Sequence, residues 1–293
     1  MGEALGDRVS RWMVFNEPLS FTIVGHLLGV HAPGIRSRSK FLAAVHHTNL
    51  AQASGAAALR SVAPDAVVGT TQYFAPIVPS GDSALHRKAT AAADALVNRL
   101  FVEPNLGLGY PTDDCGFIRP IEKVIRASDD EAVRVDWDFL GAQYYTRFRA
   151  PLLPIPGLWT APMFGRDVRR YEVTATGWEV QPDGLYDVLA RCRDWGFEHI
   201  VVTENGAAFP DRLEGDRVRD PRRIEFYRAH LTEVRRAVRD GMPIDGYFCW
   251  SLMDNFEWAD GYGPRFGITY VEYESQRRVV KDSGRWFRSL LAS

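Results

Sequence analysis

Two glutamates stand where apolar runs of the sequence end. Glu17 follows the run at 12–15, and Glu204 follows the run at 200–203. The carboxyl ends of parallel strands are where α/β folds place their sites, so both side chains could reach a substrate from a rigid backbone. Two carboxylates are the minimum equipment for glycoside hydrolysis, one as acid and one as base or nucleophile. A plainer interpretation is that each glutamate only begins a helix, whose dipole stabilises it.

Aromatic side chains gather near the end of the sequence, with acidic residues between them. The group comprises Trp250, Phe256, Trp258, Tyr262 and Phe266, interleaved with Asp254, Glu257 and Asp260. Flat rings beside hydrogen-bond acceptors suit a sugar, which has apolar C–H faces and a rim of hydroxyls. Taken alone, however, such rings are as expected in a hydrophobic core.

Other chemical motifs are weak. His46-His47 lacks a third ligand at metal spacing, so ordinary helix positions are expected there. The sequence contains no glycine-rich nucleotide loop and no G-x-S-x-G motif. The pairs Arg222-Arg223 and Arg235-Arg236 are predicted to lie on the solvated face of a helix.

Short apolar runs alternate with helical patterns along the chain. Strands are predicted at 12–15, 66–73, 139–145, 200–203 and 244–251, and helices at 41–62, 83–100, 185–192, 220–238 and around 286–290. Strand-then-helix order predicts a parallel sheet covered by helices. Periodicity does not separate an open sheet from a barrel. Two long irregular stretches, 147–176 and 255–270, are expected to line a site.

Composition narrows the class of protein. The 293 residues carry 35 Lys plus Arg and 37 Asp plus Glu, a net charge of −2, which argues against a nucleic-acid binder or a basic membrane-surface protein. The longest uncharged stretch, 41–59, is too polar to span a bilayer, and no signal peptide is visible. Three cysteines without paired spacing predict free thiols in a reducing compartment, hence a cytoplasmic protein.

Together the motifs resemble glycoside hydrolase family 1, the β-glucosidase family. They are Phe15-Asn16-Glu17-Pro18, Gln143-Tyr144-Tyr145-Thr146, Thr176-Gly177-Trp178-Glu179, Thr203-Glu204-Asn205-Gly206, Asn255-Phe256-Glu257-Trp258 and Arg265-Phe266-Gly267. They occur in the family's order over essentially the whole chain, which makes the match very specific and outweighs the plainer interpretations. The resemblance implies an α/β fold: one domain over 1–293, a partial TIM (β/α)8 barrel with about five βα units present.

The resemblance also implies roles for individual residues. Glu17 would be the general acid/base, Glu204 the nucleophile, and Tyr145 the hydrogen-bond donor to that nucleophile. In a retaining β-glycosidase the two carboxyls lie about 5–5.5 Å apart, the acid protonated and the nucleophile ionised. The implied sugar-binding residues are Asn16 at the 2-hydroxyl, Glu257 and Trp258 at outer hydroxyls, Trp250 stacked on the ring and Phe266 as a wall. The implied substrate is a small-molecule or oligosaccharide β-glycoside, and no metal or organic cofactor is implied.

Two departures from the family pattern stand out. Gln143 occupies a position where the family usually has Asn, which predicts a small shift in substrate preference. More importantly, the first predicted strand corresponds to the family's fourth, so three βα units are absent, together with a Gln and a His that bind sugar and an Arg beside the nucleophile. A misplaced start codon, a frameshift or a split gene would produce such a chain. It is expected to be inactive and poorly soluble alone, and to pair with a missing N-terminal barrel segment or self-associate through open sheet edges.

Three alternatives remain open on sequence grounds. A 6-phospho-β-glycosidase would need a cationic or hydroxylic phosphate pocket where this chain has Glu257-Trp258, and a carboxylate there would repel phosphate. A thioglucosidase would not need the acid Glu17. The third alternative is a catalytically inactive barrel fragment that binds a partner or nothing, and the DNA upstream of the Met1 codon would distinguish it from an enzyme.

Overall fold

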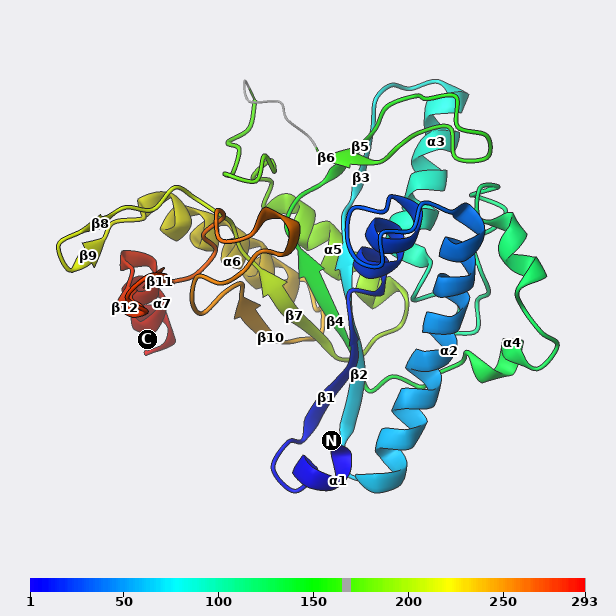
Figure 1. Ribbon diagram of the computed structural model, residues 1–293, viewed down its shortest axis with the longest axis horizontal. Helices are drawn as coiled ribbons and strands as arrows, with labels where there is room; N and C mark the ends of the chain where they lie inside the picture. The colour runs from blue at the N-terminus through cyan, green and yellow to red at the C-terminus, as the bar shows by residue number, and fades with distance from the viewer. Residues whose placement is uncertain (165–169, 293) are drawn as a thin grey trace.

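Five parallel strands form the centre of the fold. The computed structural model describes residues 1–164 and 170–292, and its main sheet has the order β1-β2-β4-β7-β10. These strands are β1 Arg11–Asn16, β2 Val67–Phe74, β4 Phe139–Tyr144, β7 Ile200–Asn205 and β10 Ile244–Cys249 (Figure 1). All five predicted strands are confirmed, each to within two residues at either end.

Helices follow the strands in chain order, as predicted. The longer ones are α2 Arg38–Val62, α3 Ala84–Asp94 with its π-helical continuation Ala95–Arg99, α5 Asp183–Asp194, α6 Pro221–Arg239 and α7 Asp282–Leu291. Shorter helical segments are α1 Gly2–Leu5, η1 Ser20–Leu27, η3 Arg119–Lys123, α4 Asp129–Ala132 and η4 Trp258–Asp260. None of the described helices combines the length and the apolar character that crossing a bilayer requires.

Small sheets occupy the connections. β3 Ile77–Pro79, β5 Phe148–Ala150 and β6 Met163–Phe164 form one sheet, while β8 Leu213–Glu214 pairs with β9 Arg217–Val218 and β11 Thr269–Glu272 with β12 Arg277–Val280. The long stretches predicted to line a site, 147–176 and 255–270, therefore include short ordered strands. Part of the first stretch, 165–169, lies outside the described residues.

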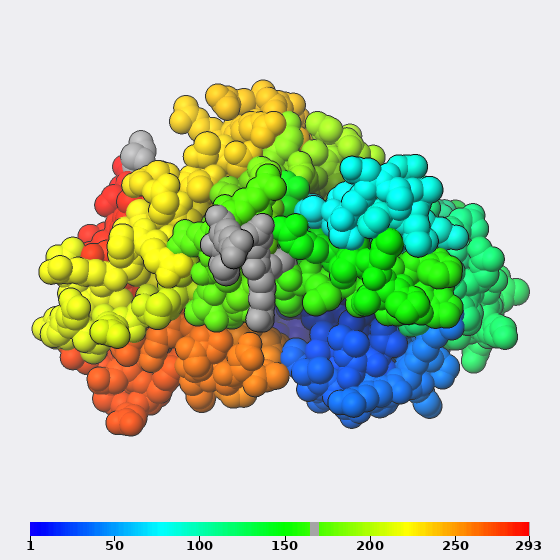
Figure 2. All heavy atoms as spheres, turned by 90° about the horizontal axis from the view of Figure 1, so that it is seen from above, coloured from blue at the N-terminus to red at the C-terminus, as the bar shows by residue number. Residues whose placement is uncertain are grey.

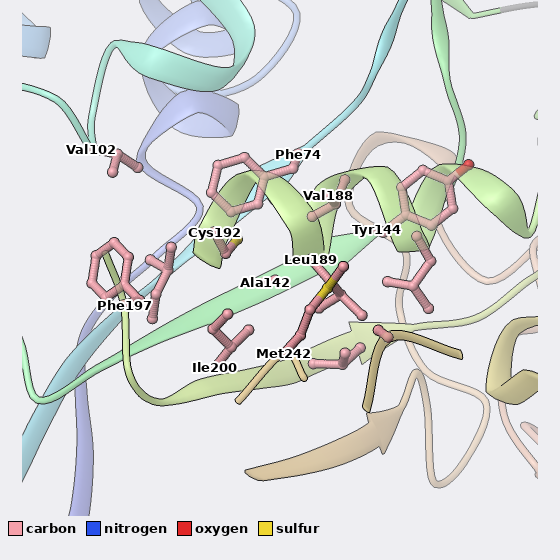
Figure 3. Close-up of a cluster of buried hydrophobic side chains, with 14 of the residues drawn as sticks. Phe74, Val102, Ala142, Tyr144, Val188, Leu189, Cys192, Phe197, Ile200 and Met242 are labelled. Carbon is pink, nitrogen blue, oxygen red and sulfur yellow. The ribbon is translucent and has the colours of Figure 1, made fainter. Parts of the chain in front are cut away.

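The main core lies between the sheet and its helices. Figure 3 shows Ala142 of β4 and Ile200 of β7 facing Val188, Leu189 and Cys192 of α5. On β4 the core residues Ala142 and Tyr144 face the helices, so alternation turns Gln143 to the other face of the sheet. A shift in register between β4 and β7 then places Glu204 beside Gln143. That face carries the chemistry described below.

The sheet is strongly curved. β1 and β10 are its outermost strands, yet the guanidinium of Arg11 at the start of β1 lies 3.2 Å from the carboxylate of Asp245 near the start of β10. Along the rest of their length, neither strand has an outer neighbour among the described residues. Met13 on β1 is 51% exposed and Phe248 on β10 is 62% exposed. The predicted open edges are therefore confirmed, and the curvature is that of an incomplete barrel.

One surface prediction is wrong. Arg222 is exposed on α6, but the side chain of Arg223 is fully buried between the carboxylates of Asp211 and Asp220. Asp220 stands at the N-cap position of this helix, but its carboxylate makes no capping hydrogen bond to it. It binds Arg223 and Ser283 instead.

Candidate active site

Glu17 sits immediately beyond the end of β1. Its backbone N–H donates to the carbonyl of Thr71 on β2 at 3.1 Å, and its φ of 43° lies in the left-handed region. That conformation costs a non-glycine residue about 1–2 kcal/mol, so the surrounding contacts must hold it. The carboxylate accepts a hydrogen bond from Ser20 Oγ at 2.7 Å. Burial raises the pKa of Glu17, and the Ser20 hydrogen bond opposes the rise. Burial thus favours the protonated form.

Glu204 lies in the last part of β7 and meets Tyr145, the residue after β4. The hydroxyl of Tyr145 donates to Glu204 Oε2 at 2.6 Å. Burial raises the pKa of Glu204 to about 7; the Tyr145 hydrogen bond lowers it, and the charges of Glu17 and Glu257 raise it. No Lys or Arg of the described ranges forms an ion pair with Glu204. At neutral pH the carboxyl is therefore divided between its two protonation states.

Glu257 belongs to the same electrostatic group. Burial raises its pKa to about 7, with contributions from Asp260 and Glu17, while a hydrogen bond from Trp250 opposes the rise. The charges of Glu17 and Glu257 also act on Glu204. Like charges that share a partly dry site cannot all be ionised at once. The arrangement therefore provides carboxyls that can give and accept protons near neutral pH.

Gln143 and Asn16 meet on the same face of the sheet. Gln143 Nε2 donates to Asn16 Oδ1 at 2.8 Å, and Gln143 pairs in register with Glu204 of the neighbouring strand. Gln143 is 1% exposed, and its Oε1 has no hydrogen-bond partner within the described part of the chain. The amide thus orients Asn16 and leaves one buried acceptor unused.

Aromatic rings close one side of this group. Tyr145 and Phe266 are buried together with Ala208, and Trp178 and Trp250 pack against them. The ring centroids of Tyr145 and Phe266 are 6.2 Å apart at 85°, an edge-to-face contact. Phe266 is only 2% exposed, so most of its surface packs against neighbouring side chains and little of it can form a pocket wall.

Trp258 lies at the rim. It is 70% exposed, has a φ of 42°, and stacks on His31 with centroids 6.3 Å apart. Figure 2 shows the loop after β10 (orange) beside the segment after β1 (blue), in agreement with that contact. An exposed ring beside buried carboxyls is placed to meet a ligand that enters from solvent.

The structure brings most of the residues predicted from the sequence to one region. Those joined by contacts or by mutual effects on their pKa values are Glu17, Glu204, Glu257, Tyr145, Asn16, Phe266 and Trp250. Trp258 stands further out. Sequence reasoning gave no role to Ser20, His31, Trp178 or Gln143's contact with Asn16. Trp178 and Gln143 had a signal that could have revealed them, because both lie in motifs that resemble the family, whereas Ser20 and His31 had none.

Two cavities lie away from these residues. One, of about 570 Å³, is lined by residues at the starts of the strands, including Arg11, His199 and Asp245. The other, of about 360 Å³, is lined by residues such as Tyr110 and Asp130. Neither cavity is lined by a predicted site residue. The carboxyls and aromatic rings described above favour the carboxyl ends of the strands, and not these cavities, as the active site. Within residues 1–164 and 170–292, no three His, Cys, Asp or Glu side chains are grouped to hold a metal ion.

The profile of glycosyl hydrolase family 1 matches residues 2–293. The chain belongs to this family. The 1,4-beta-D-glucan glucohydrolase of Thermotoga neapolitana is 37% identical over 300 residues, which cover 99% of this chain and 65% of the relative. The family 1 β-glucosidase structure from Thermotoga maritima superposes with a TM-score of 0.93 at 36% identity, covering 99% of this chain and 65% of that one. A structure of the Thermotoga maritima β-glucosidase in complex with deoxynojirimycin gives a TM-score of 0.92 at 36% identity, with the same coverage.

Family membership confirms the resemblance drawn from the motifs. It also identifies the curved sheet as a partial (β/α)8 barrel, of which the described residues contribute five parallel strands. The chain spans about 65% of the length of the curated relative and of the two structures. In barrels of this kind, catalytic groups lie at the carboxyl ends of the strands, and Glu17 and Glu204 lie at such ends.

Proposed function

We propose that this protein is a retaining β-glycosidase of the β-glucosidase type. It would hydrolyse β-linked glucosides or related sugars by double displacement with two glutamates. The observation that carries the proposal is that Glu17 and Glu204 lie at the carboxyl ends of β1 and β7 on the same sheet, where the charge of Glu17 raises the pKa of Glu204. The family relatives named β-glucosidase, and the complex of one of them with deoxynojirimycin, support a glycoside substrate.

In this mechanism Glu17 is the acid of the first step. Its raised pKa keeps a proton available for the leaving oxygen as the bond to the sugar breaks. Glu204 attacks the anomeric carbon and forms a glycosyl ester. Glu17, now ionised, removes a proton from water, which attacks the same carbon and releases Glu204. Each glutamate ends the cycle in the state in which it began.

Tyr145 has a specific part in these steps. Its hydroxyl donates a hydrogen bond to Glu204 at 2.6 Å. A carboxylate oxygen is the stronger acceptor, so this bond favours the ionised form of Glu204. When Glu204 becomes an ester, its charge disappears and the bond weakens. The pKa of Glu204 is about 7, and a further cation beside it would lower that value. A lower pKa would help the mechanism at neutral pH, because the nucleophile must be ionised to attack.

Sugar-binding roles follow from position around the two glutamates. Asn16, held by Gln143, would bind the 2-hydroxyl through its free N–H groups. Trp250 would stack on the ring and Phe266 would wall the pocket, while Glu257 and the exposed Trp258 would bind outer hydroxyls. Each role suits a neutral, hydroxyl-rich ring.

An unphosphorylated substrate is favoured over a 6-phosphorylated one. Glu257 is a half-buried carboxyl near Glu17 and Asp260, and a phosphate dianion would add to this crowded negative charge. The Glu257→Ser variant should weaken glucoside hydrolysis, and the parent should show no preference for an aryl 6-phospho-β-glucoside over the glucoside. A strong preference of the parent for the phosphorylated sugar would refute this substrate class.

We also propose that residues 1–293 form one barrel domain whose open edges need covering. Barrels of this type close with eight strands, and closure removes sheet edges. Strands of a longer form of the chain, or of a second copy, would cover β1 and β10. Comparing this chain with an upstream-extended form, by solubility and aryl β-glucoside hydrolysis, tests the idea. Equal activity in a monomeric short chain would contradict it and exclude the inactive-fragment alternative.

The nucleophile provides the decisive test of function. In a full-length form of the protein, replacing Glu204 with Gly should abolish turnover of an aryl β-glucoside, and added azide should restore part of it with an α-linked glycosyl azide as product. The reason is that a small anion can enter the space of the lost carboxylate and attack from the same side. If Glu204→Gly keeps the parent rate in a form that is active, Glu204 is not the nucleophile.

A further inference from the structure

A buried ion network joins the loop after β7 to the loop after β10. Its three carboxylates belong to Asp211, Asp220 and Asp254, and its three cations to Arg223, Arg265 and Lys281. The formal charges cancel. The side chains of all but Arg265 are at most 1% exposed, and that of Arg265 is 17% exposed. Complete burial of five charged side chains is unusual, and for one of them, Arg223, the sequence predicts a solvated helix face.

Arg223 is the centre of the network. Its two terminal nitrogens bind both oxygens of Asp211, at 3.0 and 2.9 Å, and one of them also binds Asp220 at 2.5 Å. Nη2 donates in addition to the backbone carbonyl of Arg265 at 2.7 Å. Only a planar guanidinium can make this set of bonds, because an ammonium has no rigid fork of donors.

Asp254 is the corresponding anchor in the loop after β10. It accepts hydrogen bonds from Lys281 Nζ at 2.8 Å, from Arg265 Nη1 at 2.7 Å and from the backbone N–H of Gly267 at 3.0 Å. Lys281 bridges the two halves of the network, since it also donates to Asp211 at 2.5 Å. The segment that contains Glu257 thus begins and ends at members of the network.

The network acts on the candidate site through the residue next to Arg265. Arg265 is fixed twice, by its side chain on Asp254 and by its carbonyl on Arg223. The adjacent Phe266 packs edge-to-face on Tyr145, whose hydroxyl binds Glu204. The backbone is also tight here, because a Cβ on Gly267 would lie 2.2 Å from the backbone nitrogen of Asp254.

Stability alone is a poor reason for this arrangement. A buried ion pair costs desolvation energy, and replacing it with packed apolar groups is often neutral or stabilising. What a buried ion network of this kind provides is one defined geometry, and here only Nε of Arg223 lacks a hydrogen-bond partner among the network atoms of the described residues. Here that geometry fixes where the loop of 250–266 lies against the strand ends that carry Glu17 and Glu204.

We propose that Arg223 and Lys281 are positioning residues of the sugar site. Through Asp254 and Arg265 they hold the 250–266 loop so that Glu257 and Phe266 face a sugar bound at Glu204. This inference rests on the proposed function for the identity of the ligand. The loop geometry itself can be measured without a ligand.

Hydrogen exchange of the parent and of Arg223→Lys tests the geometry. Lysine keeps the charge but loses the fork of donors. Backbone amides of the 250–266 loop and of the adjacent Gly267 should therefore exchange at least tenfold faster, while amides of β4 keep the parent rate. The control is Arg228→Met, an exposed arginine of the same helix whose only ion pair among the described residues is with Glu225. It should leave both regions unchanged.

Binding of deoxynojirimycin, measured by calorimetry, tests the consequence for the site. Arg223→Lys should raise the dissociation constant at least tenfold, and Arg228→Met should not. Val188→Ala, a change at a buried core position of α5, reports what loss of stability does by itself. It should leave the dissociation constant at the parent value well below its melting temperature. If Arg223→Lys does not fold, Lys281→Arg, which keeps the charge with altered geometry, replaces it.

The outcomes separate the two proposals. If the parent binds deoxynojirimycin and Arg223→Lys binds equally well, the positioning role is overturned and the proposed function stands. If the parent does not bind, the proposed function is contradicted for this chain, and hydrogen exchange still decides the role of the network. Faster exchange in the loop and in β4 alike would mean a purely structural role and would overturn the inference.

Discussion

The side-chain amide of Gln143 donates a hydrogen bond to Asn16 Oδ1 at 2.8 Å. Gln143 lies on β4 and Asn16 ends β1, and β2 stands between these strands, so the bond spans an intervening strand. Gln is one methylene longer than the family's usual Asn, and this length lets the Gln143 amide reach Asn16. Because Asn16 Oδ1 is occupied, the N–H groups of Asn16 remain for a sugar oxygen.

Gln143→Asn should therefore weaken binding at the 2-hydroxyl. The shorter side chain loses the bond to Asn16, which costs about 1 kcal/mol, or roughly fivefold in kcat/KM for an aryl β-glucoside. The corresponding 2-deoxyglucoside lacks the hydroxyl and should be hardly affected. Kinetics on both substrates check this, and equal losses would show that Gln143 does not act through Asn16.

Removing the acid should produce a loss that depends on the leaving group. In Glu17→Ala, kcat/KM for a dinitrophenyl glucoside should stay near the parent value, because kcat/KM reports the first step and dinitrophenolate leaves without a proton. A glucoside with a poor leaving group should slow by about 10²–10⁴-fold. A series of aryl glucosides of graded leaving-group pKa measures this. A uniform loss across the series would contradict the role of Glu17 as acid.

Glu204 should make folding stability depend on pH. Its folded pKa of about 7 lies above the unfolded value near 4.3, so the folded chain binds the proton more tightly. Stability from this group is complete below about pH 4 and is lost as the pH rises to about 7. Glu204→Gln is neutral throughout, so its unfolding free energy relative to the parent should rise between pH 4 and 8 by up to about 3 kcal/mol.

Urea unfolding at several pH values measures this difference. Glu225→Gln on α6, whose carboxyl is 64% exposed, controls for the exchange of glutamate for glutamine. A Glu204→Gln difference that stays constant from pH 4 to 8 would mean that folding does not raise the pKa of Glu204.

Much of the fold could be predicted because its signals are local. Each strand is a short apolar run. Asp220 and Pro221 indicate the start of the helix at 221–239, and Gly241 indicates its end. The same local signals placed Glu17 and Glu204 at strand ends. The barrel itself required the family resemblance, since periodicity reports only that a strand is buried and not how its sheet closes.

What the sequence could not provide depends on partners far along the chain. Arg222 and Arg223 are adjacent and look alike, yet Asp211, Arg265 and Lys281 surround only the second. The left-handed backbone of Glu17 is likewise held by tertiary contacts and has no signal in its neighbours. The ionisation of Glu204 was expected from its role, whereas its burial raises the pKa to about 7.

The open edges of the sheet should make the 293-residue chain associate with itself. Met13 on β1 and Phe248 on β10 are both more than half exposed, on strands whose outer backbone groups lack neighbours within the described part of the chain. Such edges pair readily with other chains, and a charge placed on them suppresses the pairing. The double variant Met13→Lys, Phe248→Lys should therefore shift the chain toward monomer, which sedimentation velocity measures.

Leu291→Lys is the control, because Leu291 is 76% exposed but lies on the C-terminal helix away from both edges. If the control lowers the association as much as the edge variant does, general surface charge is responsible and the edges are not. If the parent is already a monomer at high concentration, the edges do not pair with other chains.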